Sequence, residues 1–220
     1  MFCKNILESS GFLPKEIAKI KSSENGEIKV IEKGGKKSII VSGLSQSGPQ
    51  IESLWKKVLS RIKIKPQEIL ILGLGGGSLV NLLLKKWSNV IIEAVEIDPQ
   101  MIKISQDYFG VSQEKAIVIL GDATKVVKTQ KFKNRLFELI FVDLYLGEKY
   151  PKEAESDDFL TSLKKLVEED GIIIFNRLYF GGHKKKAEIF KAKLEKFFAD
   201  VKSYKSELFF PSNLLIFCKK

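Results

Sequence analysis

A short apolar segment that ends in a run of glycines constrains the fold of this chain more than any other feature. Residues 69–78 read ILILGLGGGS, and the helical pattern LVNLLLKKW continues from there. An apolar run of this length is typical of a strand buried on both faces, as in a parallel sheet covered by helices. Gly73, Gly75 and Gly77 let the backbone turn sharply, and the following helix offers unpaired N–H groups to a ligand. The pattern predicts a strand, turn and helix that bind a nucleotide.

An acidic residue, Glu96, directly follows the next predicted strand, residues 90–95. Glu96 follows Gly77 by 19 positions, close to the roughly 20-residue spacing at which an acid accepts hydrogen bonds from ribose hydroxyls. The turn fits G-x-G-x-G directly, whereas the dinucleotide pattern G-x-G-x-x-G is only approximated by Ser78. We therefore predict a nucleoside ligand, and the form of the turn favours S-adenosylmethionine. A tight strand-to-helix turn without a ligand is the alternative interpretation.

Two further predicted strands also end in acids. Asp122 follows the strand at residues 116–120, and Asp143 follows the strand at residues 136–142. Ligands of open α/β sheets lie at this carboxyl edge. Asp122 can accept a hydrogen bond from an adenine amino group while the N–H of Ala123 donates to a ring nitrogen. Asp122 can equally cap the helix that follows, and the two roles are compatible.

Five runs of the sequence carry a resemblance to a known family. The runs ILGLGGGS, VEIDPQMIKISQDYFG, LGDA, FELIFVDLY and GIIIFN resemble the class I S-adenosylmethionine-dependent methyltransferase fold, and they are most similar to its spermidine synthase branch. The likeness covers residues 67–176. The segment GEIKVIEKGGKKSIIVSGLSQSG is similar to the small β-rich domain that precedes the catalytic domain in spermidine synthases.

The resemblance implies an α/β fold with a Rossmann-like, seven-stranded, mostly parallel sheet, helices on both faces and a small N-terminal β-hairpin region. We expect residues 1–65 to form the N-terminal hairpin and helix region and residues 66–220 to form the catalytic domain. Along the chain we predict a short helix or leading segment at 5–20, strands at 27–32 and 37–41, a loop at 45–49, helices at 50–63 and 182–198, and strands at 201–205 and 214–218.

The resemblance also implies roles for single residues. Glu96 would hold the ribose, Asp122 and Ala123 the adenine, the glycine turn the methionine-derived portion, and Asp143 the amine of the ligand or the substrate. The predicted cofactor-binding residues are Gln46, Gly73, Gly75, Gly77, Glu96, Ile97, Asp122, Ala123 and Asp143, and the predicted catalytic residues are Asp143 and Tyr145. No metal ligand is predicted.

The sequence departs from aminopropyltransferases at two acids. Their Gly-Gly-Gly-Asp-Gly-Gly turn has its Asp where this chain has Gly76, and their Asp-Ser-Ser/Thr-Asp-Pro motif has its second Asp where this chain has Leu146. That second Asp helps to bind and deprotonate the attacking amine, and a leucine can do neither. A polyamine also needs several carboxylates around it. Candidate substitutes in the following loop are Glu148, Glu153 and Glu155.

Methyl transfer requires fewer catalytic groups from the protein, because the sulfonium already activates the methyl group and alignment supplies much of the catalysis. Tyr145 is placed to orient or deprotonate an acceptor, or simply to cover the ligand. We therefore predict a spermidine synthase-like, S-adenosylmethionine-dependent transferase that methylates an unidentified small acceptor. The alternatives are an aminopropyltransferase that uses decarboxylated S-adenosylmethionine and a non-catalytic nucleoside-binding protein.

The charge of the chain bears on its partners. The net charge is +10, yet of 37 basic residues only Arg61, Arg135 and Arg177 are arginines. Recognition of phosphate and guanine depends on the arginine fork, so the lysine bias predicts a solvated basic surface and disfavours a nucleic-acid partner. The resemblance implies a small-molecule acceptor and leaves open a homodimer formed through the N-terminal regions, as is common in spermidine synthases.

Composition excludes several other classes. No apolar run approaches the roughly 20 residues of a membrane-spanning helix, and the start of the chain lacks the pattern of a secretory signal. Cys3 and Cys218 are the only cysteines, too few for a disulfide framework. We therefore expect a cytoplasmic protein with no membrane partner. The single histidine, His183, is expected to begin a helix, and a position facing the active site is the alternative.

Overall fold

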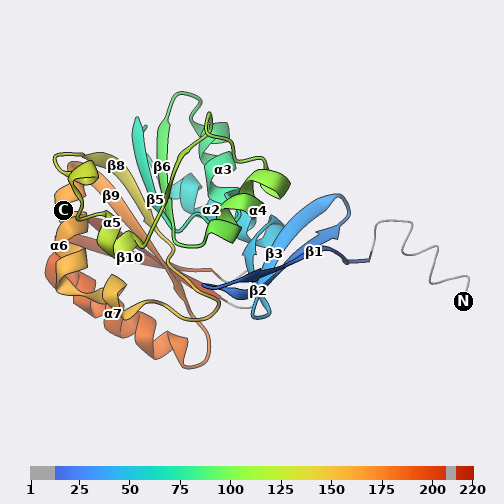
Figure 1. Ribbon diagram of the computed structural model, residues 1–220. Coiled ribbons are helices and arrows are strands. Elements are labelled where there is room, and N and C mark those ends of the chain that lie inside the picture. Colours follow the sequence, from blue (N-terminus) through green and yellow to red (C-terminus); the bar gives the residue numbers. More distant parts are fainter. Residues whose placement is uncertain (1–12, 207–211) are drawn as a thin grey trace, which may run out of the picture.

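The computed structural model describes residues 13–206 and 212–220, which form two sheets (Figure 1). The first sheet has four antiparallel strands in the order β1 (Lys15–Ser22), β2 (Gly26–Lys33), β3 (Lys36–Val41) and β4 (Leu44–Ser47). The second has seven strands in the order β10 (Asp200–Lys205), β11 (Asn213–Lys219), β9 (Val167–Leu178), β8 (Phe137–Val142), β5 (Glu68–Leu72), β6 (Ile91–Glu96) and β7 (Ile117–Leu120). Strands β9 to β7 run parallel, and β11 and β10 run antiparallel to their neighbours. The predicted α/β fold class is confirmed.

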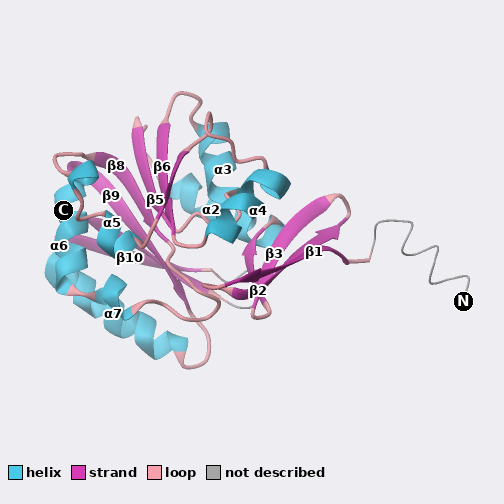
Figure 2. Ribbon diagram, viewed as in Figure 1, coloured by secondary structure: helices cyan, strands magenta, loops and turns pink. Residues whose placement is uncertain are grey.

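Helices cover both faces of the seven-stranded sheet (Figure 2). The helices are α2 (Pro49–Arg61), α3 (Ser78–Lys86), α4 (Pro99–Phe109), α5 (Ala123–Val126), α6 (Asp157–Leu166) and α7 (His183–Phe197), with 3₁₀ turns η1 (Gln130–Phe132) and η2 (Lys152–Glu155). One face packs on α6 and α7, and the other packs on α2 and α3. The predicted helices at 50–63 and 182–198 and the two final strands are confirmed within one to two residues.

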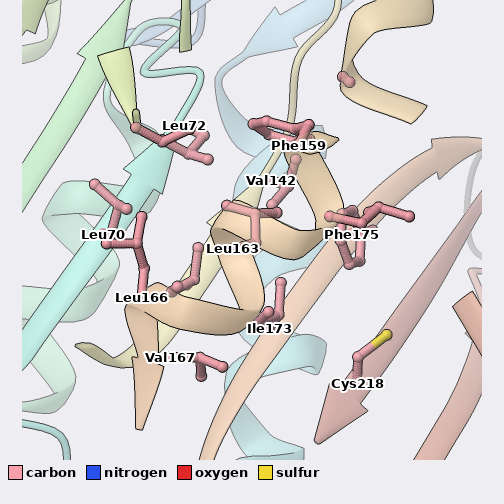
Figure 3. Packing of buried hydrophobic residues seen from close by; sticks show 14 of the residues in the cluster. Leu70, Leu72, Val142, Phe159, Leu163, Leu166, Val167, Ile173, Phe175 and Cys218 are labelled. Atoms are coloured by element: carbon pink, nitrogen blue, oxygen red, sulfur yellow. The ribbon is translucent and has the colours of Figure 1, made fainter. Parts of the chain in front are cut away.

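Strand β5 shows why its sequence is apolar throughout. Leu70 and Leu72 pack in the cluster that contains α6, and Ile69 and Ile71 pack in the cluster that contains α2 and α3. Side chains of a strand alternate between its two faces, so a strand covered on both faces needs apolar residues at every position. Figure 3 shows Leu70 and Leu72 among other residues of the first cluster, with Leu70 near Leu166. The buried strand carries the glycine turn at its carboxyl end.

Two sequence-based expectations in the N-terminal region are wrong. Strand β1 occupies positions 15–22, where a short helix was one expectation, and β4 occupies 44–47, where a loop was expected. The alternation in β1 is interrupted by a bulge between Glu16 and Ala18, and β4 has mostly polar residues. Both strands form because β2 and β3 offer them partners, which local patterns do not reveal. Residues 1–12 lie outside the described part of the chain.

The four-stranded sheet packs directly on the glycine turn. A Cβ atom placed on Gly76 would lie 2.6 Å from both Ile39 Cδ1 and Ser47 Oγ. The hydroxyls of Ser47 and Ser78 are 2.6 Å apart, and the N–H of Gly48 donates to Ser78 Oγ at 3.1 Å. A side chain at position 76 therefore requires Ile39 and Ser47 to shift, because β3 and β4 fill that space.

A buried carboxylate joins the same sheet to helix α4. Asp98 is 0% exposed, and its Oδ2 accepts hydrogen bonds from Ser22 Oγ at 2.5 Å and from Asn25 Nδ2 at 2.6 Å. Its Oδ1 caps α4 by accepting from the N–H of Gln100 at 2.8 Å. Apolar residues of β2 and β3 pack beside Met101 of α4. The turn between β1 and β2 is thus tied to the carboxyl end of β6.

We predict that Gly76→Ala lowers the free energy of unfolding by about 1–3 kcal/mol, because the added methyl group overpacks the contact with β3 and β4. Urea denaturation followed by circular dichroism measures the change. Gly182→Ala is the matched control, since no atom lies within 4 Å of a Cβ placed on Gly182 and its φ is −65°. Equal stability of the two variants would contradict the contact.

Candidate functional site

A cavity opens at the carboxyl ends of the parallel strands. It holds about 830 Å³ of space not filled by atoms, part of it open to solvent. We call it the first chamber. Its lining includes these predicted site residues: Gln46, Gly73, Gly75, Glu96, Ile97, Asp122, Ala123, Asp143 and Tyr145. The fold therefore gathers nine of the predicted residues at one place, as the strand-end argument requires. Gly77 does not line this chamber; it precedes α3 as the N-cap residue with a φ of +77°, and a Cβ on it would lie 2.2 Å from Val111 Cγ2.

Gly73 lets two strand ends meet at the floor of the first chamber. Its φ is +96°, and a Cβ atom on it would lie 2.1 Å from the carbonyl oxygen of Asp143. The N–H of Asp143 donates to the carbonyl of Leu72 at 2.8 Å, and the N–H of Gly73 donates to the carbonyl of Val95 at 2.9 Å. Only glycine permits this approach, so Gly73 places β5, β6 and β8 close together.

Glu96 holds the glycine turn in place. Its Oε2 accepts hydrogen bonds from the N–H groups of Leu74 and Gly75, each at 3.1 Å, and its Oε1 accepts from the N–H of Asp98 at 3.0 Å. Burial raises the pKa of Glu96, and these three hydrogen bonds oppose that rise. A carboxylate has about four acceptor positions, so about one remains for a ligand. The side chain both shapes the turn and lines the chamber.

Asp122 caps helix α5 and still lines the first chamber. Its Oδ1 accepts hydrogen bonds from the N–H of Thr124 at 2.9 Å and from Thr124 Oγ1 at 2.7 Å. Burial alone would raise the pKa of Asp122, but the bonds from Thr124 and the nearby charge of Lys125 bring it below its ordinary value. The two roles considered for Asp122 are structurally compatible, and the side chain stays ionised at neutral pH.

A second chamber adjoins the first. It holds about 600 Å³ of space not filled by atoms, part of it open to solvent. Gln46, Ile51, Asp143 and Tyr145 line both chambers, so Asp143 and Tyr145 stand at their junction. The residues that line the second chamber alone are Leu44, Ser45, Gln50, Leu54, Gly147, Asn176, Leu178, Ser206 and Asn213. Its wall is therefore built from β4, α2, the end of β9 and the start of β11.

An amide relay supports Asp143 from the second chamber. Asn213 Nδ2 donates to Asn176 Oδ1 at 2.8 Å, and Asn176 Nδ2 donates to Asp143 Oδ1 at 2.9 Å. Burial raises the pKa of Asp143 to about 6, although the bond from Asn176 lowers it in part. Asp143 thus changes its charge close to neutral pH. Sequence reasoning missed both asparagines, and the only signal was a polar residue at the end of the apolar run GIIIF.

Tyr145 acts as a hydrogen-bonding group. Its hydroxyl accepts from the N–H of Leu178 at 2.6 Å, and its ring meets the ring of Tyr150 edge-on with centroids 5.1 Å apart. Burial raises the pKa of Tyr145 to about 12, against the opposing effect of the Arg177 charge. The phenol is therefore protonated at neutral pH, and its own O–H can donate. Of the roles expected from the sequence, this favours orienting an acceptor over deprotonating one.

A buried arginine fixes the loop that covers the site. Arg177 is 3% exposed; its Nη2 contacts Glu155 Oε1 at 2.6 Å, and its guanidinium lies 3.9 Å from the ring centre of Tyr150 and 4.5 Å from that of Phe190. Cation–π contacts of this kind gain strength when the cation is buried. Arg177 therefore holds the segment from Tyr145 to Glu155 against β9 and α7. The sequence carried no pattern that predicted this.

The acids considered as substitutes lie elsewhere in this loop. Glu155 pairs with Arg177, and Glu148 Oε2 lies 3.8 Å from His183 Nε2 at the start of α7, where the histidine was expected. Glu148, Glu153 and Glu155 do not line either chamber. Within residues 13–206 and 212–220, no helix is long and apolar enough to cross a membrane, and no cluster of three or more His, Cys, Asp or Glu side chains suits a metal ion.

Comparisons with known proteins relate this chain to a family and to several relatives. The profile of the family described as Spermine/spermidine synthase domain matches residues 52–219. A polyamine aminopropyltransferase from Vibrio vulnificus (strain CMCP6) is 33% identical over 113 residues, which are 51% of this chain and 38% of that protein. The eEF1A lysine and N-terminal methyltransferase homolog of Drosophila pseudoobscura pseudoobscura is 32% identical over 148 residues, which are 64% of this chain and 22% of that protein.

A solved structure matches nearly the whole chain. The spermidine synthase from Thermotoga maritima superposes with a TM-score of 0.76 at 18% identity, covering 93% of this chain and 72% of that one. At this identity the match concerns the fold. The matched regions span well under half the length of the two curated relatives named above. Those two relatives, one named for aminopropyl transfer and one for methyl transfer, differ in the group they transfer.

We predict that Glu96→Ala abolishes calorimetric binding of S-adenosylhomocysteine, because three N–H groups around the turn lose their acceptor. The same loss lowers the free energy of unfolding by at least about 2 kcal/mol. Glu114→Ala, at an exposed position, is the control for removal of a carboxylate. Unchanged affinity in the Glu96 variant would show that the turn does not need this support.

We predict that the Asp143 carboxyl titrates near pH 6 and that Asn176→Leu moves its midpoint to higher pH. Loss of the Asn176 hydrogen bond removes a contact that favours the charged carboxylate, so the proton is held more tightly. Carboxyl ¹³C NMR follows the titration, and Asp143→Asn identifies the signal by its disappearance. A midpoint at or below that of the unmodified chain would contradict the role of Asn176.

Proposed function

Because the chain belongs to the spermine/spermidine synthase domain family, we propose that it is an S-adenosylmethionine-dependent transferase that moves a methyl group to a small acceptor. One observation carries the choice of methyl over aminopropyl transfer. Among the described residues, Asp143 is the only carboxylate that lines the second chamber. A polyamine acceptor carries several positive charges, and one carboxylate cannot balance them.

The residues of the first chamber fit the cofactor. Asp122 offers an acceptor for the adenine amino group, and Glu96 keeps about one acceptor position for a ribose hydroxyl. Apolar side chains, among them Trp55 and Met101, line the same chamber and suit a base. The methionine-derived portion would then lie along Gly73 and the turn, toward the junction. When bound, S-adenosylmethionine supplies a methyl group already activated by its sulfonium.

The residues at the junction have the properties that methyl transfer requires. Tyr145 donates a hydrogen bond from a protonated phenol and orients the acceptor. Asp143 accepts a proton from the acceptor, because a carboxyl with a pKa of about 6 is largely ionised at neutral pH. Asn176 keeps Asp143 in place through its hydrogen bond. Catalysis then consists mainly of alignment with one proton acceptor.

Two positions of the site, Gly76 and Leu146, disfavour aminopropyl transfer. The acid that aminopropyltransferases carry in the glycine turn has no space here, because a Cβ on Gly76 would overlap Ile39 and Ser47. Leu146, at the place of the second acid, lines the first chamber with an aliphatic side chain. A glycine at position 76 also leaves the turn without a negative charge that would repel the carboxylate of S-adenosylmethionine.

We predict that S-adenosylmethionine binds at least about tenfold more tightly than its decarboxylated form in calorimetric titrations, because only the former offers a carboxylate to the turn. Incubation with methyl-labelled cofactor and cell extract, followed by mass spectrometry, should then yield a product heavier by one labelled methyl group. A preference for the decarboxylated ligand would favour aminopropyl transfer. Tight cofactor binding without transfer to any acceptor would favour a nucleoside-binding protein.

A further inference from the structure

The charge and polarity of the residues that line the second chamber indicate which class of molecule binds there. We propose that the acceptor is a singly charged primary amine with an uncharged polar body, bound with its ammonium at Asp143 and its body among the amides of the second chamber. This inference rests on the proposed transferase function, because it names the class of acceptor used at that site.

The charge of the described lining supports one ammonium. Asp143 supplies one carboxylate, and no lysine or arginine stands among the described residues of this wall. The relay from Asn176 occupies Asp143 Oδ1, and within the described residues Oδ2 has no hydrogen-bond partner from the protein. Asp143 lines both chambers and so stands where they meet. One cation can therefore be neutralised there.

A second ammonium would find no counter-charge in the described wall. The nearby acids of the covering loop are elsewhere, with Glu155 against Arg177 and Glu148 facing His183. The remaining polar groups of the wall are amides and hydroxyls. When a cation is buried without an opposite charge, its loss of hydration free energy exceeds the free energy gained from hydrogen bonds to such neutral groups. Within the described residues, the wall therefore offers no site for a second cation and disfavours diamines and polyamines.

The neutral wall suits an amide or hydroxyl on the acceptor. The side chains Gln46, Gln50, Asn176 and Asn213 place amides in the wall, and Ser45 and Ser206 add hydroxyls. A polar group that enters the chamber must regain the hydrogen bonds that it made with water. Leu44, Leu54 and Leu178 supply apolar surface for a short alkyl chain. An amine joined by such a chain to an amide matches all three features.

The transfer step balances with these residues. The bound ammonium gives one proton to the Asp143 carboxylate, and the freed nitrogen lone pair forms a bond to the methyl carbon. The carbon–sulfur bond breaks, and its electron pair stays on sulfur as a neutral thioether. A neighbouring sulfonium charge lowers the pKa of the amine and favours the first proton transfer. The product is the secondary ammonium, and Asp143 returns its proton to solvent.

The test compares two amines of equal chain length. Putrescine carries two ammonium groups, and N-acetylputrescine carries one ammonium and one amide. Each is titrated calorimetrically into the full chain saturated with S-adenosylhomocysteine. We expect N-acetylputrescine to bind at least about tenfold more tightly than putrescine. Equal binding, a preference for putrescine or no binding of either amine would overturn the inference. Because the cofactor product is bound first, loss of cofactor binding appears separately, and the experiment with methyl-labelled cofactor tests the proposed transfer itself.

Two matched variants add a charge inside and outside the chamber. Gln50 and Gln100 each follow a proline at the first turn of a helix, and only Gln50 lines the second chamber. An acid is favourable at this helix position, so both variants should fold. We expect Gln50→Glu to raise putrescine affinity at least about fivefold and Gln100→Glu to leave it unchanged. An equal change in both variants, or no gain in Gln50→Glu, would contradict the placement of the amine.

Discussion

The carboxylate of Glu96 is the contact on which the rest of the site depends. It accepts hydrogen bonds from the N–H groups of Leu74 and Gly75 in the turn and of Asp98, the N-cap residue of α4. Asp98 in turn binds Ser22 and Asn25 of the N-terminal sheet. A buried carboxylate is costly unless such donors surround it. Removal of either acid would therefore loosen the turn, the helix and the sheet together.

The N-terminal sheet shapes the candidate site because it fills space at the turn. Ile39 and Ser47 occupy the position that a side chain at residue 76 would need, and Gln46 lines both chambers. The absence of an acid at Gly76 is thus built into the packing between two sheets. Gly76 and Leu146 are uncharged, and the second chamber carries the amides of Asn176 and Asn213. Within the described residues, Asp143 is the one carboxylate of that chamber.

Much of the fold was predictable because its determinants are local. The unbroken apolar run of β5 indicates burial on both faces, and the spacing from Gly77 to Glu96 accommodates one helix, α3, and one strand, β6. The errors fall where pairing decides the structure. Strand β4 has only four residues, and strand β1 has an interrupted alternation, so both depend on β2 and β3 for their form.

The sequence by itself determined the strand, turn and helix at residues 68–86 and the row of acids at Glu96, Asp122 and Asp143, because hydrophobic periodicity and glycine geometry act over short stretches. Only the tertiary structure decided which polar atoms meet. Asn176 reaches Asp143 across 33 positions, and Asn213 reaches Asn176 across 37. Such contacts depend on strand order and on packing between layers, which no local pattern encodes. The cofactor class was therefore readable from the chain, whereas the character of the second chamber emerged only from the fold.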